Sequence, residues 1–165
     1  MINRRILMAG AGATVAGCAQ SIPQQPIYEG AEVTRVVVYK NKRIMQLLHD
    51  TTVLRQYKFE LGFAPEGHKV EFGDGRTPEG AYRINRLNPN SRYHRSLGIS
   101  YPNRRDIANA RARGVDPGGD IFIHGTPKKE AGKTDWTYGC IAIKDSEVQE
   151  MYDMVKVGTP IVIYP

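Results

Sequence analysis

Cysteine is almost absent from this sequence, and long apolar runs are absent altogether. Cys18 and Cys140 are the only cysteines among 165 residues, which excludes a disulfide-rich scaffold and a zinc site with four cysteine ligands. The most apolar stretch, residues 6–17, is too short to cross about 30 Å of hydrocarbon as a helix. No internal repeat is visible, so repeat architectures are excluded as well. The length itself predicts one folded domain.

Acidic residues are outnumbered by basic ones, but only mildly. The chain has 23 Lys+Arg against 17 Asp+Glu, a formal net charge of +6 at pH 7. Such an excess fits an acidic partner, whether nucleic acid, anionic lipid or a cell-wall polymer, and selects none of them. Hydrophobic residues make up 41% of the chain and charged residues 24%, with 17 glycines and 10 prolines. This composition excludes a disordered chain and predicts a globular protein rich in turns.

The first residues have the composition of an export signal. Arg4 and Arg5 precede an apolar run with small residues at its end, which is typical of a signal peptide. Residues 15–18 (Val-Ala-Gly-Cys) resemble the lipobox of bacterial lipoproteins, in which lipid is attached to the cysteine thiol and the chain is cut before it. The resemblance implies a lipoprotein signal peptide over residues 1–17 and lipidation of Cys18. A plain secretory signal is the alternative, and Sec and Tat export are not distinguished.

Residues 18–31 predict a lipid anchor followed by a tether, because this segment holds two prolines and several small or amide side chains. Lipid on Cys18 would hold the protein at the membrane, on the periplasmic face of the cell envelope. Ala19 after the cysteine, in place of an aspartate, resembles an outer-membrane sorting signal. The folded domain is then expected over residues 32–165, where Cys140 has no cysteine partner and is a free thiol.

Short β-strand patterns separated by turn residues dominate the folded part of the chain. The predicted strands cover residues 33–39, 43–48, 53–61, 81–87, 120–124, 140–143 and 160–164. One helix is predicted over residues 103–113, and a second begins at Asp145 as its N-cap and ends at Gly158. This order of elements predicts a mainly β fold, a sandwich or barrel with one or two helices.

His124 and Cys140 are the residues that most clearly carry chemistry. His124 ends one predicted strand and Cys140 begins the next, so neighbouring strands would bring the imidazole and the thiol within reach. A thiolate is a nucleophile, and an imidazole takes its proton or stabilises it as an ion pair. Gly139 permits a sharp turn before the cysteine and lets backbone N–H groups face a substrate carbonyl. An inert, buried cysteine is the alternative, because free cysteine also behaves as a small hydrophobe.

Three short motifs follow one another in an informative order. They are a Thr-Pro-x-Gly loop at residues 77–80, a His-Gly pair at 124–125, and Thr-Tyr-Gly-Cys-Ile at 137–141. Together they resemble the active-site signature of L,D-transpeptidases of the YkuD type, and the resemblance covers residues 33–164. It implies a β-sandwich or barrel of mixed sheets with one or two helices.

The resemblance further implies a thiol enzyme that acts on peptidoglycan stem peptides. In that family the cysteine attacks the bond between the L-centre of diaminopimelate and the terminal D-alanine, and the acyl group then passes to an amine. By position, Cys140 is the nucleophile and His124 the general base and later the acid. Backbone N–H groups of Tyr138, Gly139 and Cys140 would form the oxyanion hole, and a backbone carbonyl would orient the histidine. The resemblance implies no cofactor, no metal and no nucleic-acid partner.

Two positions depart from the family pattern. Tyr138 stands where many members have histidine, and Ala142 stands where many have arginine or asparagine. A Gly-Cys-x-Ala pattern resembles a branch that hydrolyses the link between peptidoglycan and its attached lipoprotein. Three hypotheses therefore stay open: an L,D-transpeptidase, a hydrolase on the same scaffold that cleaves this link or the stem peptide, and a wall-binding lipoprotein without activity.

Further residues near the motifs are predicted to contact the substrate. They are Gly125, Thr137, Tyr138, Trp136 and His94. His94 lies in a predicted loop and is either a cleft residue or a surface group, and Trp136 either walls a pocket or packs in the core. A reactive Cys140 is expected to be exposed, with a pKa below that of free cysteine.

The remaining polar residues have no motif context. His49 and His68 are predicted to be bystanders, and no short His/Cys spacing of the metal-binding kind is present, which disfavours a zinc site. Arginines at positions 104, 105, 111 and 113 form a solvated helix face or a surface for an anionic wall polymer.

Overall fold

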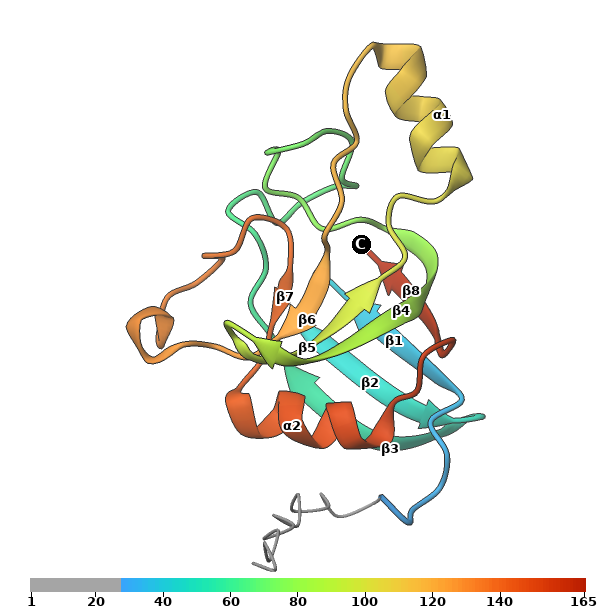
Figure 1. Cartoon of the computed structure of the whole chain (residues 1–165), viewed down its shortest axis with the longest axis vertical. Helices are drawn as coiled ribbons and strands as arrows, with labels where there is room; N and C mark the ends of the chain where they lie inside the picture. Colours follow the sequence, from blue (N-terminus) through green and yellow to red (C-terminus); the bar gives the residue numbers. More distant parts are fainter. Residues whose placement is uncertain (1–27) are drawn as a thin grey trace, which may run out of the picture.

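An eight-stranded mixed sheet organises residues 28–165, the part of the chain that the computed structural model describes (Figure 1). The strands are β1 (Arg35–Tyr39), β2 (Ile44–His49), β3 (Thr52–Lys58), β4 (Gly80–Ser91), β5 (His94–Ile99), β6 (Phe122–His124), β7 (Ile141–Ala142) and β8 (Pro160–Tyr164). They lie in the order β3-β2-β1-β8-β4-β5-β6-β7. Two helices, α1 (Arg104–Arg113) and α2 (Asp145–Met154), and a short 3₁₀ helix, η1 (Lys128–Glu130), complete the fold. The predicted mainly β class is confirmed.

The expected export and anchoring segments fall outside this part of the chain. The signal peptide predicted over residues 1–17, the lipidation of Cys18 and the tether as far as residue 27 lie outside the described residues. Within residues 28–165, no helix has the length and apolar character needed to cross a membrane.

β4 curls the sheet because its two halves have different partners. Residues 80–83 pair with β8, whereas residues 84–91 pair with β5. The β4–β5 register shifts twice, and such bulges bend a strand and increase its twist. β3 and β7 are the two edge strands of the sheet. Glu60, which follows β3 along the chain, forms an isolated β-bridge with Ala142 in β7. The two ends of the sheet therefore meet, and the sheet approaches a closed barrel.

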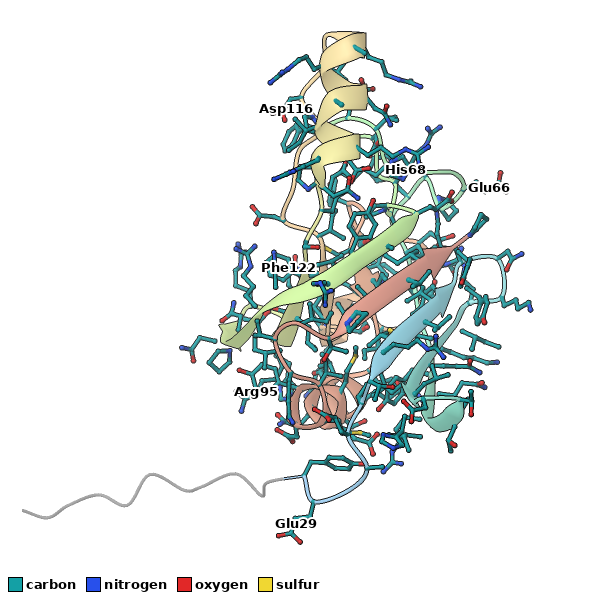
Figure 2. All side chains as sticks on the ribbon, turned by 90° about the vertical axis from the view of Figure 1, so that its right-hand side faces the viewer. Glu29, Glu66, His68, Arg95, Asp116 and Phe122 are labelled. Carbon is teal, nitrogen blue, oxygen red and sulfur yellow. The ribbon has the colours of Figure 1, made fainter. Side chains whose placement is uncertain are left out.

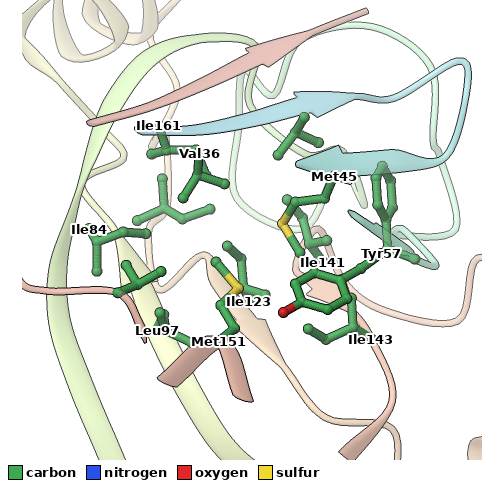
Figure 3. Close-up of a cluster of buried hydrophobic side chains, with 14 of the residues drawn as sticks. Val36, Met45, Tyr57, Ile84, Leu97, Ile123, Ile141, Ile143, Met151 and Ile161 are labelled. Atoms are coloured by element: carbon green, nitrogen blue, oxygen red, sulfur yellow. The ribbon is translucent and has the colours of Figure 1, made fainter. Parts of the chain in front are cut away.

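The hydrophobic core lies directly behind the strands that carry the chemistry. α2 packs against β5 and β6, and its buried Val148, Met151 and Met154 recur at helical spacing. Figure 3 shows Met151 beside Ile123 of β6 and Ile141 of β7, which are both fully buried. Because side chains alternate along a strand, the neighbours of these two isoleucines face away from the core. His124 and Cys140 are among those neighbours.

Most predicted elements are present, with one omission and two shifted helix boundaries. β5 was not predicted, and β4 is longer than the strand expected over residues 81–87. α2 has Lys144 as its N-cap, so Asp145 is its first helical residue. The helix ends at Met154, four residues before Gly158, because Val155 adopts an extended conformation (φ −98°, ψ 134°) and is buried.

Candidate active site

Parallel strands β6 and β7 place His124 and Cys140 around one pocket. Ile123 pairs in register with Ile141, so the residues that flank this pair share the opposite face of the sheet. His124 and Cys140 both line a pocket of about 330 Å³. The other lining residues come from the β4–β5 hairpin and the segment around β6: Asn88, Asn90, Ser91, Arg92, Tyr93, Ser96, Asp120 and Phe122. The fold thus brings the imidazole and the thiol to the same pocket.

His124 is held in one orientation and one tautomer. Its Nδ1 lies 2.7 Å from the Gly125 carbonyl oxygen, which can only accept a hydrogen bond, so Nδ1 carries the hydrogen. Nε2 then holds the lone pair of the neutral ring. The imidazole stacks on Tyr93 at 4.4 Å between centroids, and burial lowers its pKa although the Gly125 bond opposes this. At neutral pH the ring is therefore uncharged and able to accept a proton at Nε2.

The Cys140 thiol does not have the low pKa expected from the sequence. It is half-buried, and burial raises its pKa above the ordinary value. The Asp120 carboxylate raises this pKa further, while a backbone hydrogen bond from Phe122 lowers it. Sγ lies 3.6 Å from the Asp120 carbonyl oxygen, as a donor. The thiol is therefore protonated at neutral pH and needs a base to become a nucleophile.

Three backbone segments meet so closely behind Cys140 that only glycine fits at the contact. Gly139 has φ 116°, and a Cβ there would lie 2.5 Å from the Arg76 carbonyl oxygen. A Cβ on Gly62 would lie 2.6 Å from the Gly139 nitrogen. The Thr77 hydroxyl donates to the Gly139 carbonyl at 2.8 Å. This bond gives the Thr-Pro-x-Gly motif its physical role, which is to hold the turn before the cysteine.

Hydrogen bonds inside the turn distinguish the three predicted oxyanion-hole donors. The N–H of Gly139 donates to Thr137 Oγ1 at 3.2 Å. The N–H groups of Tyr138 and Cys140 have no hydrogen-bond acceptor among residues 28–165 and stay available. Thr137 is buried and its hydroxyl donates to the Cys140 carbonyl at 2.7 Å, so it holds the turn, and its contact with the substrate stays a prediction.

Gly125 and Trp136 contact His124 but do not line the pocket. Gly125 is buried and its N–H donates to the Tyr93 carbonyl at 2.9 Å, so it joins two segments beside His124, and its contact with the substrate stays a prediction. Trp136 is half-buried and presents its ring at 5.7 Å from that of His124, outside the pocket lining. Trp136 therefore packs against the base and does not wall the pocket.

His94 and Tyr138 are both exposed, but their surroundings differ. His94 begins β5 with φ 70° and does not line the pocket, whereas its neighbour Tyr93 does. Tyr138 is 78% exposed and meets Phe63 edge to face at 5.6 Å. The surface-group alternative therefore holds for His94, and Tyr138 stays accessible to a substrate.

Sequence reasoning missed several residues of the site. Asp120 and Tyr93 line the pocket, and the Asp120 carboxylate pairs with Arg86 at 2.5 Å. The sequence indicated only that Asp120 begins the apolar strand that ends at His124, and it gave Asp120 no role of its own. His68 does not line this pocket, but it has a structural contact, because its Nδ1 accepts from the N–H of Glu79 at 2.9 Å in the Thr-Pro-x-Gly loop. Among residues 28–165, no three His, Cys, Asp or Glu side chains gather as a metal site.

Comparisons with known proteins agree with this geometry. The YkuD family model, described as the L,D-transpeptidase catalytic domain, matches residues 33–163. "Putative L,D-transpeptidase YafK" of Escherichia coli K12 is 28% identical over 142 residues, which cover 82% of this chain and 50% of YafK. The chain thus spans about half the length of the curated relatives that it matches.

Solved structures share the fold. The helical cell shape determining protein Pgp2 of Campylobacter jejuni matches with a TM-score of 0.64 and 25% identity, over 82% of this chain and 49% of Pgp2. An L,D-transpeptidase from Mycobacterium smegmatis matches with a TM-score of 0.55 and 19% identity, over 82% and 60% of the two chains. Because the family model covers nearly the whole described domain, the chain belongs to the YkuD family of L,D-transpeptidase catalytic domains.

Proposed function

We propose that this protein is a cysteine-dependent L,D-transpeptidase that acts on peptidoglycan stem peptides, with Cys140 as the nucleophile and His124 as the base. One observation carries the proposal. His124 has Nδ1 tied to the Gly125 carbonyl, which leaves Nε2 as the proton acceptor in the pocket that Cys140 lines. Membership of the L,D-transpeptidase family supports the reaction class.

The first half-reaction transfers the acyl group to the protein. As Cys140 Sγ attacks the substrate carbonyl carbon, its proton moves to His124 Nε2, because the two pKa shifts keep the thiol protonated and the ring neutral beforehand. The oxyanion accepts hydrogen bonds from the N–H groups of Tyr138 and Cys140. The imidazolium then protonates the leaving nitrogen, the C–N bond breaks, and D-alanine departs from a Cys140 thioester.

The second half-reaction releases the acyl group to an acceptor amine. His124 removes a proton from the amine, the amine nitrogen attacks the thioester carbon, and the thiolate leaves and is reprotonated by the imidazolium. Polar side chains at the pocket, including Asn88, Asn90 and Arg92, suit a peptide substrate with free carboxylates. The name of Pgp2 as a cell shape determinant supports a role in remodelling the wall.

A hydrolase on the same scaffold is the second candidate. Its product would come from attack of water on the thioester, with the stem peptide or the peptidoglycan–lipoprotein link as substrate. Ala142 favours this candidate, because its Gly-Cys-x-Ala pattern resembles a hydrolytic branch of the family and its buried side chain offers no polar group. A wall-binding lipoprotein without activity is the third, and it gives no role to the arrangement of His124 and Cys140.

The place of the reaction is the periplasmic face of the cell envelope. We propose that lipid on Cys18 anchors the chain there, with the outer membrane favoured. The motivation is the Val-Ala-Gly-Cys sequence at residues 15–18. Mass measurement of the mature protein tests this part separately: acylated Cys18 at the N-terminus supports it, and a soluble mature chain without lipid contradicts it.

Products from defined stem peptides distinguish the three candidates. Purified protein is incubated with a disaccharide-tetrapeptide and an excess of a D-amino acid, and the products are identified by mass spectrometry. Exchange of the terminal D-alanine, or a cross-linked dimer, means transfer. A shortened stem alone means hydrolysis, and so does freed lipoprotein when sacculi carrying it are the substrate. Unchanged substrates with wild-type protein, as with Cys140→Ser, would leave only a binding function and contradict the proposal.

A further inference from the structure

Tyr93 lies in the turn between β4 and β5, but a distant segment of the chain holds it in place. Its carbonyl accepts a hydrogen bond from the N–H of Gly125 at 2.9 Å, and its own N–H donates to Ser91 Oγ at 3.1 Å. Its ring stacks on the His124 imidazole, with 4.4 Å between the centroids and 25° between the planes. The Tyr93 ring is thus fixed over one face of the imidazole, although the residue is 37% exposed.

Trp136 packs against both rings of this stack. Its ring centroid lies 6.0 Å from that of Tyr93 and 5.7 Å from that of His124, and its plane is inclined to theirs by 45° and 61°. Aromatic rings at such separations and angles attract one another. If Tyr93 turned away from His124, its ring would lose both contacts, so the stack is the favoured arrangement.

The His124 ring has no carboxylate partner. Its Nδ1 donates to the Gly125 carbonyl, and among residues 28–165 no carboxylate oxygen lies within 4.0 Å of either ring nitrogen. The titratable and charged groups in the elements around it belong to Asp120, Cys140, Arg92 and Asp145. The Asp120 carboxylate pairs with Arg86, and that of Asp145 lies beside Gly125 at the start of α2. Neither carboxylate forms an ion pair with the imidazole.

The titratable side chains at the start of β5 are also directed elsewhere. His94 is exposed and lies outside the pocket lining. Arg95 lies beside α2 in Figure 2, where its guanidinium is 4.8 Å from the centroid of the Tyr152 ring and its Nε donates to the Gln149 side chain at 3.1 Å. On this side of the imidazole, the contact is made by the Tyr93 ring.

We propose that the face of the Tyr93 ring stabilises the imidazolium form of His124, a role that a carboxylate fulfils in many histidine bases. The proposal rests on the proposed function and names the residue that supports its base. When Cys140 Sγ gives its proton to His124 Nε2, a positive charge arises at a buried ring. A cation within about 6 Å of a tyrosine ring face is attracted by the ring quadrupole, and most strongly where water is excluded. The stack meets this condition.

Exclusion of water is the alternative role of the Tyr93 ring, and the two roles have opposite signs. A ring that only excludes water disfavours the imidazolium, so its removal would raise the pKa of His124. A ring whose face stabilises the imidazolium favours it, so a weaker face would lower this pKa. A test must therefore weaken the ring face without admitting water.

Fluorinated rings at position 93 meet this requirement, because fluorine withdraws electron density from the ring face and changes the shape of the ring little. In the full-length protein, Tyr93→Phe is the reference, and mono- and trifluorinated phenylalanine are then placed at the same position. The titration of His124 is followed by NMR without substrate. We expect its midpoint to fall stepwise along the series, by roughly half a pH unit with the trifluorinated ring.

Two controls accompany this series. The same fluorinated rings placed at Phe72, which is 77% exposed, should leave the His124 titration unchanged. The His68 signal serves as an internal control in every spectrum, since Figure 2 shows this residue at the other end of the domain from Arg95. It should be the same in all variants at position 93.

Kinetics then connect the titration with the reaction. The acid limb of kcat/KM for a stem peptide should move to lower pH in the same order as the NMR midpoints. If the wild type turns over no stem peptide, the proposed function fails, whereas the NMR titration still decides the role of Tyr93. A His124 midpoint that is unchanged or rises along the fluorinated series, or an equal fall with the rings at Phe72, would overturn the proposal.

Discussion

The two walls of the Cys140 pocket are built in opposite ways. One wall is formed by Cys140, which ends the turn at residues 137–140, and bonds from distant segments, such as Thr77 to Gly139, fix the backbone of this turn. The other is the hairpin at residues 88–93, where local bonds, such as that from the N–H of Asn90 to Asn88 Oδ1 at 2.9 Å, hold the tip, and the Tyr93 carbonyl at its end accepts from the N–H of Gly125. Its polar side chains, including Arg92, are largely exposed.

This difference separates chemistry from recognition. The turn presents N–H groups and a thiol in a geometry that its neighbours enforce, as transition-state stabilisation requires. The hairpin presents side chains from a surface loop, where substrate contacts can change without disturbing the core. Substitutions in the first wall, and at the base beside it, should therefore lower kcat. Substitutions in the second wall should act mainly on KM.

Among the variants that keep some activity, the largest loss of kcat is expected at His124, the general base. His124→Ala removes the acceptor of the thiol proton and the later acid for the leaving nitrogen, so kcat should fall about 10²–10⁴-fold. Steady-state kinetics with the stem peptide measures this, and circular dichroism shows that the fold is retained. Adding His124→Ala to Cys140→Ser should cause no further loss, because both residues serve one covalent step.

The pH profile distinguishes a base from a merely structural residue. His124 works only when neutral, and burial lowers its pKa, so the neutral form persists to lower pH than in an ordinary histidine with pKa 6.5. The acid limb of wild-type kcat/KM should therefore have its midpoint below pH 6.5 and vanish in His124→Ala. An unchanged limb in the variant would contradict the role of base.

Gly139→Ala should have the next largest effect. A Cβ at φ 116° and 2.5 Å from the Arg76 carbonyl must displace the turn, and a shift of about 1 Å in reacting groups lowers turnover about 10²-fold. Gly158→Ala is the matched control, since Gly158 also has a positive φ (96°) but open space around its Cβ. It should lower stability and spare kcat. Equal kcat losses in both variants would mean that backbone strain alone matters.

Thr77→Val tests the bond that secures the turn. It leaves the buried Gly139 carbonyl without its hydroxyl donor, which should cost about 1–3 kcal/mol of unfolding free energy and lower kcat about tenfold. Thr77→Ser keeps the hydroxyl and should recover most of the activity. Thermal or denaturant unfolding, together with kinetics, gives both quantities. A valine variant with wild-type kcat would show that the motif does not position the turn.

Arg92→Gln should have the smallest effect and a different signature. The side chain is exposed on the hairpin wall of the pocket, so loss of its charge should raise KM for the stem peptide about threefold with kcat unchanged. His94→Gln, two residues along and outside the pocket lining, should change neither constant. A fall in kcat for Arg92→Gln as large as that for Gly139→Ala would erase the distinction between the two walls.

Local patterns explain why much of this site could be predicted. His124 ends an apolar strand, and a glycine stands directly before Cys140, so both features appear in a few neighbouring residues. The strands that became β1, β2 and β8 have dense β-branched or alternating apolar residues. Where the local sequence alone specifies the conformation, the prediction and the structure agree.

The missing parts depend on contacts between distant segments. β5 contains Gly98, which disfavours a strand, and it forms because β4 and β6 pair with it on both sides. Gly62 matters only because its backbone meets Gly139. The raised pKa of Cys140 likewise follows from burial against the Asp120 segment, which no spacing along the sequence reveals.

The central claim is that Cys140 carries the substrate acyl group, and intact-protein mass spectrometry tests it most directly. The protein is mixed with a disaccharide-tetrapeptide in the absence of an acceptor amine. The reaction is quenched in acid, and the mass of the intact protein is measured. The account predicts a mass increase equal to the substrate minus D-alanine, located on the Cys140 peptide and absent from Cys140→Ser. Product formation by Cys140→Ser at the wild-type rate, or an adduct on another residue, would contradict it.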